Sequence, residues 1–379
     1  MSKKILFSCT ELMALQFMLP HLKYLKERGN HVELLCSNVG NRIDELRQKL
    51  AIDYSIPLHV VSLKRSPFSV RNILGFFEVK KIIMTSQYDT IATNEPVMGA
   101  VTRMAAKFAN FKGKVIYTTH GFHFYKGRNP VLNFVFRRIE MLLAKLCDKI
   151  VTINEEDYQA ILQFRISNPN LQCALVNGMG VDLSRFKKMS EADRSKEREQ
   201  NLLEQGNKLI ICTGELNANK NQQMVLKGLA PLIKKDSSIK LLLAGRGRLE
   251  NYLRRLSHRL GIADNVVFLG YRKDIEKVIG MSDVAISASI REGLGLNLIE
   301  AMACGLPIVC SQNRAHKDII KTGACGKMFN LKNVESLSEA IQEILYNTNK
   351  SDAAKVNIQA STIYSINAIK TAYYNQIIN

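Results

Sequence analysis

The 379-residue sequence has no run of about 18 consecutive apolar residues, the length that a helix needs to cross a membrane. Its N-terminus, MSKKILFSC, is basic and then apolar, but the apolar part is too short for a secretory signal and no small-residue cleavage site follows it. We therefore expect a cytoplasmic protein whose first apolar segment is a strand.

The eight cysteines include no C-x-x-C pair, which argues against a zinc site and against a redox dithiol. They are scattered through apolar segments, so we expect buried, reduced side chains. The sequence also has no short repeat and no low-complexity tract.

The length suggests two domains, and strand-like and helix-like segments alternate through both halves. The predicted strands are 3–9, 31–37, 90–93, 114–120 and 148–153, and then 208–215, 239–245, 265–270, 284–289 and 306–311. The predicted helices are 14–29, 41–51 and 133–146, and then 222–235, 251–261, 273–282 and 297–305. This rhythm predicts an α/β protein with two doubly wound parallel sheets.

The alternation restarts after about residue 205, which sets the expected domain boundaries. We expect a first domain over 1–186, a charged linker region over 187–207 and a second domain over 208–357. A last helix, about 358–379, is expected to pack back on the first domain. Ligands of such sheets bind at the carboxyl ends of strands, so we expect the site in a cleft that the two domains face.

The net charge is +19, and the first half is the more basic. Residues 1–190 carry 27 Lys and Arg against 15 Asp and Glu, whereas residues 191–379 carry 26 against 19. Such an excess suits nucleic acid, an anionic membrane surface or phosphorylated ligands. Charge alone does not choose among these partners.

The most informative loop lies in REGLGLNLIEAMACGLPIV, residues 291–309. Glu292 precedes a helix expected from about Leu296, and Glu300 lies in the second turn of that helix. The loop and the helix N-terminus would offer a diphosphate the amides of Gly293, Leu294, Gly295 and Leu296. The two carboxylates can accept hydrogen bonds from sugar hydroxyls. An ordinary acidic first turn is the alternative, but it leaves the glycine pair unexplained.

Two further loops of the second domain carry glycine and positive charge. TGELNANKNQQ, 213–223, follows a strand and places Lys220 before a helix that Asn217, Asn219 or Asn221 caps. AGRGR, 244–248, supplies two glycines with two arginines. A solvated lysine and an ordinary strand-to-helix turn are the simpler interpretations.

In the first domain, IYTTHGFHF places His120 just after a strand. His120 would face the cleft, whereas His123 is expected to pack among aromatic side chains. No third ligand completes a metal site. The segment VNGMGVDLSRF, 176–186, is expected to form a turn toward the interdomain link.

Together these segments resemble retaining glycosyltransferases of family 4, which have the two-domain GT-B fold, and the resemblance covers nearly the whole chain. Its most specific part is the Glu292-x7-Glu300 spacing in EGLGLNLIEAMACGLPIV, joined by VNGMGVDLSRF, GELNANKN, AGRG and FLGYRKDI. TTHGFHFYKG and IVTINEEDY further resemble bacterial capsule, exopolysaccharide and O-antigen transferases.

The resemblance implies roles for individual residues. Glu292 and the amides after it hold the donor sugar and its phosphate, and Glu300 takes the ribose hydroxyls. Lys220 neutralises the diphosphate, and His120 lies near the reacting centre. The donor site would also include Gly214, Glu215, Gly245 and Arg246. Glu215 departs from the family, which often has arginine there; either Arg246, Arg248 or Arg291 compensates, or Glu215 holds Lys220 or meets the donor.

The implied reaction transfers a hexose or N-acetylhexosamine, with retention, from a nucleotide-diphosphate sugar, UDP-linked, to a hydroxyl. The implied acceptor is a polyprenyl-diphosphate-linked saccharide for surface polysaccharide. Positive charge and a helix dipole stabilise the leaving group, so no metal and no cofactor is expected. The resemblance implies a fold class that requires no Asp-x-Asp metal motif.

Two basic and apolar segments, 63–84 and 126–149, suggest peripheral contact with an anionic membrane surface on the inner face of the plasma membrane. The alternative for each is a buried helix with a basic outer face.

Three other functions compete with the transferase. A nucleic-acid binder would also be basic, but the basic residues are dispersed and no binding module is present, so no nucleic-acid partner is expected. A GT-B-fold epimerase lacks the EGLGLNLIEAMACG segment in this form. A non-catalytic protein would not need Glu292, Glu300, Lys220 and His120 together.

Overall fold

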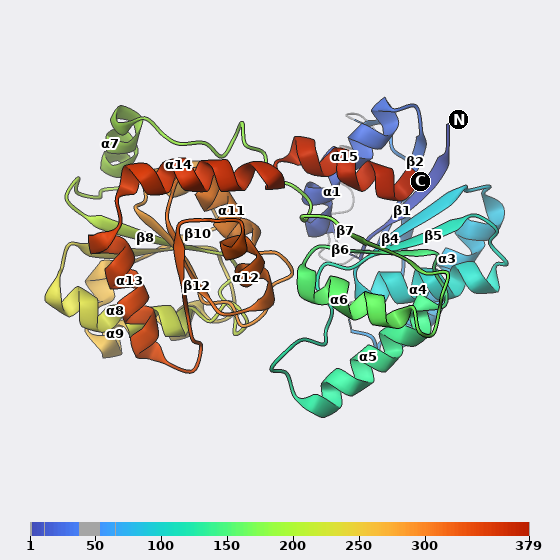
Figure 1. The fold of residues 1–379 in the computed structure, drawn as a ribbon, viewed down its shortest axis with the longest axis horizontal. Coiled ribbons are helices and arrows are strands. Elements are labelled where there is room, and N and C mark those ends of the chain that lie inside the picture. The colour runs from blue at the N-terminus through green and yellow to red at the C-terminus, as the bar shows by residue number, and fades with distance from the viewer. Residues whose placement is uncertain (1, 11, 38–53, 65, 379) are drawn as a thin grey trace. The chain divides into compact units, whose positions relative to one another are not determined.

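The computed structural model describes residues 2–10, 12–37, 54–64 and 66–378, so the predicted helix 41–51 lies outside the described residues. The chain divides into two compact units (Figure 1). Unit 1 comprises Met1–Gly180 and Ile366–Asn379, and unit 2 comprises Val181–Ser365.

Unit 1 is built on a seven-stranded parallel sheet with the order β3-β2-β1-β4-β5-β6-β7. Its strands are β1 (Lys4–Ser8), β2 (His31–Ser37), β3 (Leu58–Val61), β4 (Thr90–Asn94), β5 (Lys114–Thr118), β6 (Lys149–Thr152) and β7 (Gln172–Leu175). The order reverses between β1 and β4, which is the position where open α/β sheets bind ligands.

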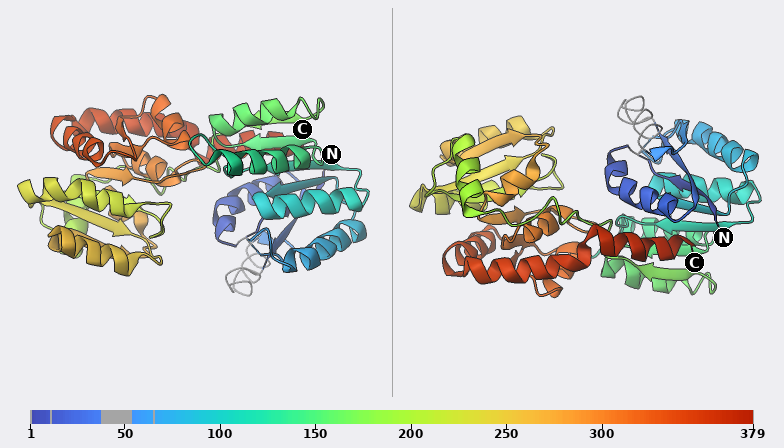
Figure 2. Two further views of the ribbon diagram at one scale, coloured as in Figure 1. Left: turned by 90° about the horizontal axis from the view of Figure 1, so that it is seen from below. Right: turned by 90° about the horizontal axis from the view of Figure 1, so that it is seen from above.

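Helices cover both faces of this sheet because the side chains of a strand alternate between faces (Figure 2). Ile5 and Phe7 of β1 belong to the core under α1 and α15, whereas Leu6 belongs to the core under α3, α4 and α6. The helices are α1 (Leu12–Glu27), α3 (Arg71–Thr85), α4 (Pro96–Phe108), α5 (Pro130–Ala144), α6 (Glu155–Phe164) and α15 (Ile366–Ile378).

Unit 2 has a six-stranded parallel sheet with the order β10-β9-β8-β11-β12-β13. Its strands are β8 (Lys208–Thr213), β9 (Ile239–Ala244), β10 (Val266–Gly270), β11 (Val284–Ser287), β12 (Ile308–Ser311) and β13 (Gly326–Phe329). Its α-helices are α7 (Glu191–Gln200), α8 (Gln222–Lys235), α9 (Glu250–Leu260), α10 (Ile275–Gly280), α11 (Leu296–Ala303), α12 (Arg314–Lys321), α13 (Val334–Asn347) and α14 (Lys350–Ser361).

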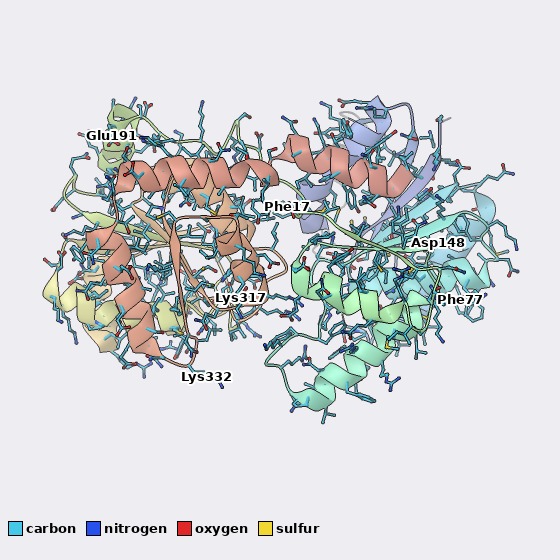
Figure 3. All side chains as sticks on the ribbon, viewed as in Figure 1. Phe17, Phe77, Asp148, Glu191, Lys317 and Lys332 are labelled. Atoms are coloured by element: carbon cyan, nitrogen blue, oxygen red, sulfur yellow. The ribbon has the colours of Figure 1, made fainter. Side chains whose placement is uncertain are left out.

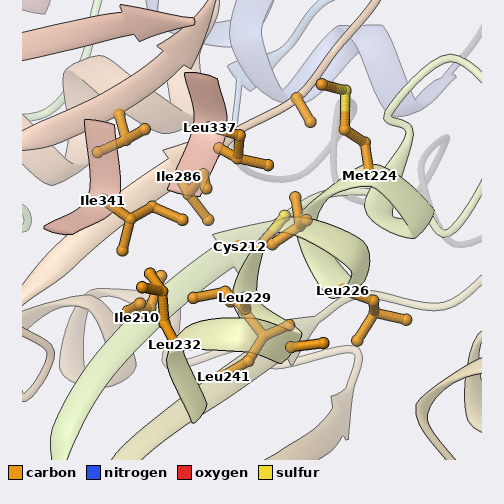
Figure 4. Packing of buried hydrophobic residues seen from close by; sticks show 14 of the residues in the cluster. Ile210, Cys212, Met224, Leu226, Leu229, Leu232, Leu241, Ile286, Leu337 and Ile341 are labelled. Atoms are coloured by element: carbon orange, nitrogen blue, oxygen red, sulfur yellow. The ribbon is translucent and has the colours of Figure 1, made fainter. Parts of the chain in front are cut away.

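One face of the unit 2 sheet packs against α8, α9 and α13 (Figure 4). Ile210 and Leu241 from the sheet meet Leu229 of α8 and Leu337 of α13 in one apolar cluster. Elsewhere in unit 2, α11 packs against α10 and α14. The segment from β11 to α11 carries both predicted glutamates, Glu292 and Glu300.

The predicted linker region 187–207 is not a simple connection, because it contains α7 and belongs to unit 2. Arg198 of α7 is buried and donates to Asp283, at 2.9 Å, and to the carbonyl of Met281. The unit boundary falls at Gly180 rather than at residue 186. The high charge of this segment indicated a solvated connection, whereas one of its charges forms a buried ion pair.

The end of the chain also differs from the single helix expected at 358–379. The helix α14 ends at Ser361, a 3-10 turn (η3) spans Thr362–Tyr364, and α15 begins at Ile366. In unit 1, α15 packs against α1 and buries Ile369, Tyr373 and Ile377. All ten predicted strands and five predicted helices, 222–235 among them, match to within two residues at each end. The edge strands β3, β7 and β13, which are only partly buried, were not predicted.

Candidate functional site

The predicted site residues of unit 2 come mainly from loops after neighbouring strands. Lys220 follows β8, and Glu292 follows β11, which pairs with β8 where the strand order reverses. The carboxyl ends of parallel strands meet at one edge of a sheet, so these two loops lie side by side. Their contact is a salt bridge of 2.6 Å between Lys220 Nζ and Glu292 Oε1.

This ion pair is largely shielded from solvent, with 22% of the Lys220 side chain and 15% of the Glu292 side chain exposed. Burial alone would raise the pKa of Glu292. The Lys220 ammonium and a hydrogen bond from Ser289 outweigh burial, so the pKa of this carboxyl lies below its ordinary value. Glu292 is therefore ionised at neutral pH, and its charge fixes the Lys220 ammonium.

Asn219 holds the backbone of the Glu292 loop from one side. Its side-chain amide donates to the carbonyl of Arg291 and its side-chain oxygen accepts from the Arg291 amide, at 2.9 and 3.2 Å. The carbonyl of Asn219 also accepts from the amide of Ile290. These three bonds explain how Lys220, the next residue, comes to lie against Glu292.

The end of β12 and the start of α12 hold the same loop from the other side. Ser311 Oγ and Asn313 Nδ2 both donate to the carbonyl of Ser289, at 2.6 and 3.0 Å. Arg314 Nε donates to the carbonyl of Glu292, at 3.2 Å. Hydrogen bonds from both sides thus fix the loop 289–292.

The helix α11 begins at Leu296, as predicted, and Glu292 precedes it. Gly295 is the N-cap with a φ of +92°, and a Cβ atom there would lie 3.3 Å from the ring of His316 and from Ile319. A side chain would be strained at this position both by φ and by contact. Leu294 is buried, which anchors the turn.

Glu300 lies in the second turn of α11, where burial raises its pKa to about 7, while Arg185 and Lys220 partly offset that rise. None of the described residues donates a hydrogen bond to its carboxylate. A half-buried acceptor with no internal donor is suited to hydroxyl groups of a ligand.

We expect Glu300→Gln to stabilise the protein above pH 7. The folded carboxyl binds its proton more tightly than the unfolded one, so the contribution of Glu300 to stability falls as pH rises from 4.5 through 7. Removing the charge should add about 1–3 kcal/mol at pH 8 and nothing near pH 4. Thermal unfolding across this range, with the exposed Glu339→Gln as control, measures the effect; parallel curves for Glu300→Gln and wild type would contradict it.

Glu215 and Arg246 do not join the ion pair. Both side chains are exposed, and Glu292, rather than Glu215, holds Lys220. The hypothesis that Glu215 holds Lys220 is therefore wrong. Glu215 contributes its carbonyl, which accepts from the buried Gln222.

The glycines after β8 and β9 serve the approach of one loop to another. A Cβ atom on Gly245 would lie 1.9 Å from the carbonyl oxygen of Gly214, and one on Gly247 would lie 2.3 Å from that of Leu216. Gly214 has a φ of +137°, and the aliphatic end of Lys220 lies beside it. Gly245 thus allows the loop after β9 to approach the backbone of the loop after β8.

The prediction that an asparagine side chain caps α8 is wrong. Asn221 occupies the N-cap position in a left-handed conformation, with no capping hydrogen bond from its side chain. Asn217 instead accepts from the amide of Lys220, and Asn219 holds the Glu292 loop. The loop places its asparagines for the site rather than for the helix.

His120 lies in unit 1, directly after β5, and is partly buried. Its Nε2 is 3.1 Å from Oδ1 of Asn94, at the end of β4. Burial lowers the pKa of His120 to about 4, so the ring is neutral at pH 7. His123 stacks on Phe136, as expected.

Sequence patterns did not indicate several residues that surround Glu292. Asn219 lies in TGELNANKNQQ as one of three candidate helix caps, and no sequence pattern indicated Ser289 or Arg314. His316 is fully buried beneath Gly295, which no sequence pattern indicated. In the described part of the chain, no cluster of three or more His, Cys, Asp or Glu side chains has the geometry of a metal site.

Two parallel-sheet units with this order and these loops define the class of the protein, a GT-B glycosyltransferase fold. The chain superimposes on the structure of Anabaena Alr3699/HepE in complex with UDP and glucose with a TM-score of 0.78 over 99% of both chains, at 21% identity. Residues 18–182 match the family model Glycosyltransferase Family 4, and residues 193–360 match Glycosyl transferases group 1.

Two curated relatives match most of the chain. A putative glycosyltransferase, EpsD of Bacillus subtilis (strain 168), is 34% identical over 349 residues, 91% of this chain and 88% of that protein. A UDP-Gal:alpha-D-GlcNAc-diphosphoundecaprenol alpha-1,3-galactosyltransferase of Escherichia coli is 22% identical over 357 residues, 92% of this chain and 90% of that protein. The chain belongs to glycosyltransferase family 4.

Proposed function

We propose that this glycosyltransferase moves a hexose or N-acetylhexosamine from a UDP-linked donor to a hydroxyl of a polyprenyl-diphosphate-linked saccharide, with retention and without a metal. The observation that carries the proposal is the Lys220–Glu292 ion pair, directly before the glycine turn that begins α11. The name of the Escherichia coli relative, with its UDP-galactose donor and diphosphoundecaprenol acceptor, supports this choice of donor and acceptor class.

The leaving group of this reaction is a nucleoside diphosphate, whose charge grows as the glycosidic bond breaks. An ammonium and a helix N-terminus both stabilise such charge. Lys220 supplies the first and α11 the second, and the bonds from Asn219 and the start of α12 hold them in place. In a site already fixed in this way, little reorganisation is needed as the charge develops.

The two glutamates take different parts in this proposal. Glu292 remains ionised through Lys220 and positions the donor sugar through its hydroxyls. Glu300, without a donor of its own, accepts from the ribose hydroxyls. No general base is assigned: the acceptor hydroxyl gives its proton to the departing phosphate oxygen on the same face of the sugar, which retains the anomeric configuration.

Nucleotide binding tests the donor half of the proposal. We expect UDP to raise the thermal midpoint more than GDP, ADP or CMP. A ligand at 100 times its Kd adds about 2.7 kcal/mol to the free energy of unfolding, which is measurable as a higher midpoint. Lys220→Ala and Glu300→Ala should lose the shift, whereas Lys227→Ala, an exposed lysine on α8, should keep it. Transfer from UDP-sugars to a polyprenyl-diphosphate saccharide then tests the reaction. A protein that no nucleotide stabilises would overturn the proposal.

A membrane surface is the second partner in the proposal. The outward faces of α3 and α5 carry exposed apolar side chains beside exposed Arg71, Lys81, Arg137 and Arg138. The exposed apolar residues are Phe68 and Val70 just before α3, Ile73, Leu74, Phe77 and Met84 on α3, and Val131, Leu132, Phe134, Val135, Ile139 and Leu142 on α5. Phe68 is 94% exposed, and Phe77, which is labelled in Figure 3, is 59% exposed. Only Glu140 and Ala144 of α5 are buried among its described residues, so the alternative of a buried helix is wrong for α5.

Apolar and basic side chains on one helix face suit an anionic bilayer, where rings enter the interface and cations meet headgroups. No described helix is both long and apolar enough to span a bilayer, so the proposed contact is peripheral.

Flotation with liposomes tests this contact. The protein should float with phosphatidylglycerol vesicles at low salt and not with phosphatidylcholine vesicles. Phe77→Glu with Leu142→Glu should lower the bound fraction at least about tenfold, because each buried apolar side chain contributes about 1.5–3 kcal/mol. Leu202→Glu, at a 95% exposed position of unit 2, is the matched control. Equal binding by the double variant and wild type would exclude this surface.

A further inference from the structure

In unit 1, the ends of β1, β4 and β5 bring one residue each to the point where the strand order reverses. These residues are Ser8, Asn94 and Thr118, and all three are buried. His120 follows two residues after β5 and contacts this group through Asn94. The side chain of Asn94 is therefore the link between the sheet and His120.

The hydrogen bonds fix which way the Asn94 amide faces. Its Nδ2 is 3.1 Å from the carbonyl oxygen of Ser8. A carbonyl oxygen can only accept, so the nitrogen of the amide must face it, and Oδ1 must face the other way. Oδ1 then meets Nε2 of His120, which must carry the proton for this bond to form.

A second donor reaches the same oxygen from the C-terminal helix. The hydroxyl of Tyr373, on α15, lies 3.4 Å from Oδ1 of Asn94 and 2.8 Å from Oγ1 of Thr118. Tyr373 is 1% exposed, and its ring packs edge-on against the ring of His21. A residue 279 positions further along the chain thus helps to hold the partner of His120.

The backbone next to Asn94 is strained. Glu95 has a φ of +65° and a ψ of 154°, a combination that only glycine adopts readily. The strained residue joins the end of β4 directly to Pro96, the first residue of α4. Such strain persists where the surroundings fix the conformation, and it gathers at functional sites.

We infer that Asn94, held by Tyr373, is a positioning residue that fixes His120 with its proton on Nε2, so that Nδ1 is the atom His120 offers to a sugar hydroxyl. The inference rests on the proposed function for the identity of that ligand. In the described part of the chain, Nδ1 of His120 has no hydrogen-bond partner.

The consequence is a histidine that accepts, rather than donates, at the substrate. Burial keeps the ring neutral at pH 7, and the bond from Nε2 to Asn94 holds the proton on that nitrogen. A hydroxyl that donates to Nδ1 is thereby oriented. Without Asn94, the ring would rotate and carry its proton on either nitrogen.

The direct test is the tautomer, read from long-range proton–nitrogen NMR spectra of the full-length protein labelled with 15N-histidine. His120→Asn assigns the signals by their loss. We expect wild type to carry the proton on Nε2 alone. Asn94→Leu, which removes the acceptor at similar volume, should give a mixture of tautomers. A wild-type ring protonated on Nδ1 would overturn the inference, whether or not the protein transfers sugar.

Kinetics separates positioning from folding. Asn94→Leu should lower kcat about 10- to 100-fold, with KM for the donor and the UDP-induced thermal shift changed less than twofold, because the donor's diphosphate is assigned to residues of unit 2. Tyr373→Phe, which removes one hydroxyl, should lower kcat by less. Tyr24→Phe, whose exposed hydroxyl lies 3.3 Å from Thr371 Oγ1 of α15 but outside this network, should be silent.

Two outcomes contradict the inference in different ways. If Asn94→Leu retains the wild-type tautomer while stability and kcat fall together, Asn94 supports only the fold. If the tautomer changes and kcat does not, His120 does not act through Nδ1. Failure of UDP to bind the wild-type protein would instead contradict the proposed function, and the NMR result would stand apart from it.

Discussion

Replacing Lys220 by methionine should lower kcat/KM for sugar transfer about 100- to 1,000-fold, the effect of removing one group that stabilises developing charge. Methionine retains the length of the side chain and removes its ammonium. The same change leaves the Glu292 carboxylate, only 15% exposed, without its cation. Stability should therefore fall as well, by about 1–3 kcal/mol.

A double-mutant cycle separates the two losses. In Lys220→Met with Glu292→Gln, neither charge is left unpaired, so the thermal midpoint should return toward wild type while kcat/KM stays low. Lys208→Met is the control, because Lys208 forms an ion pair of 2.7 Å with Asp236 elsewhere in unit 2. If activity recovered together with stability in the double variant, Lys220 would matter only through the fold.

The largest loss of stability is expected for Asp283→Ala. Asp283 is 6% exposed and is paired with Arg194, Arg198 and Lys350, at 2.6, 2.9 and 2.7 Å. It also accepts from the amide of Leu209 on β8. Its removal strands the buried Arg198 guanidinium, which should cost about 3–5 kcal/mol.

Urea unfolding measures this loss as a lower midpoint. Asp236→Ala, which removes a more exposed partner, should cost less. Asp283→Leu combined with Arg198→Met replaces both buried charges by apolar groups and should recover most of the loss. A midpoint for Asp283→Ala equal to that of Asp236→Ala would show that α7 is not held to the sheet by this carboxylate.

The sequence predicted the sheet elements well where apolar runs were long. The segments 208–215 and 239–245 became β8 and β9, and the helix 222–235 became α8. The strands β7 and β13 lie at sheet edges and are only partly buried, so QCAL and GKMF lack the continuous apolar run of buried strands of equal length such as β11 and β12. The segment 187–207 was misjudged because composition does not distinguish a solvated charge from one paired with Asp283.

For the site, the motif around Glu292 indicated the correct helix start and the correct order of carboxylate, glycine pair and carboxylate. It did not indicate that Lys220 pairs with Glu292 rather than with Glu215. That choice depends on which loops follow neighbouring strands, and β8 and β11 are 70 residues apart in the chain but adjacent in the sheet.

The sequence by itself determined the class of fold, the family and the segments that carry the candidate chemistry, because periodicity and local motifs are properties of neighbouring residues. Only the tertiary structure decided which charges meet, how Asn219 and the start of α12 fix the Glu292 loop, and how Tyr373 reaches Asn94. The physical reason is that burial and hydrogen-bond direction depend on groups brought together by sheet order, whereas local sequence records only what lies next along the chain.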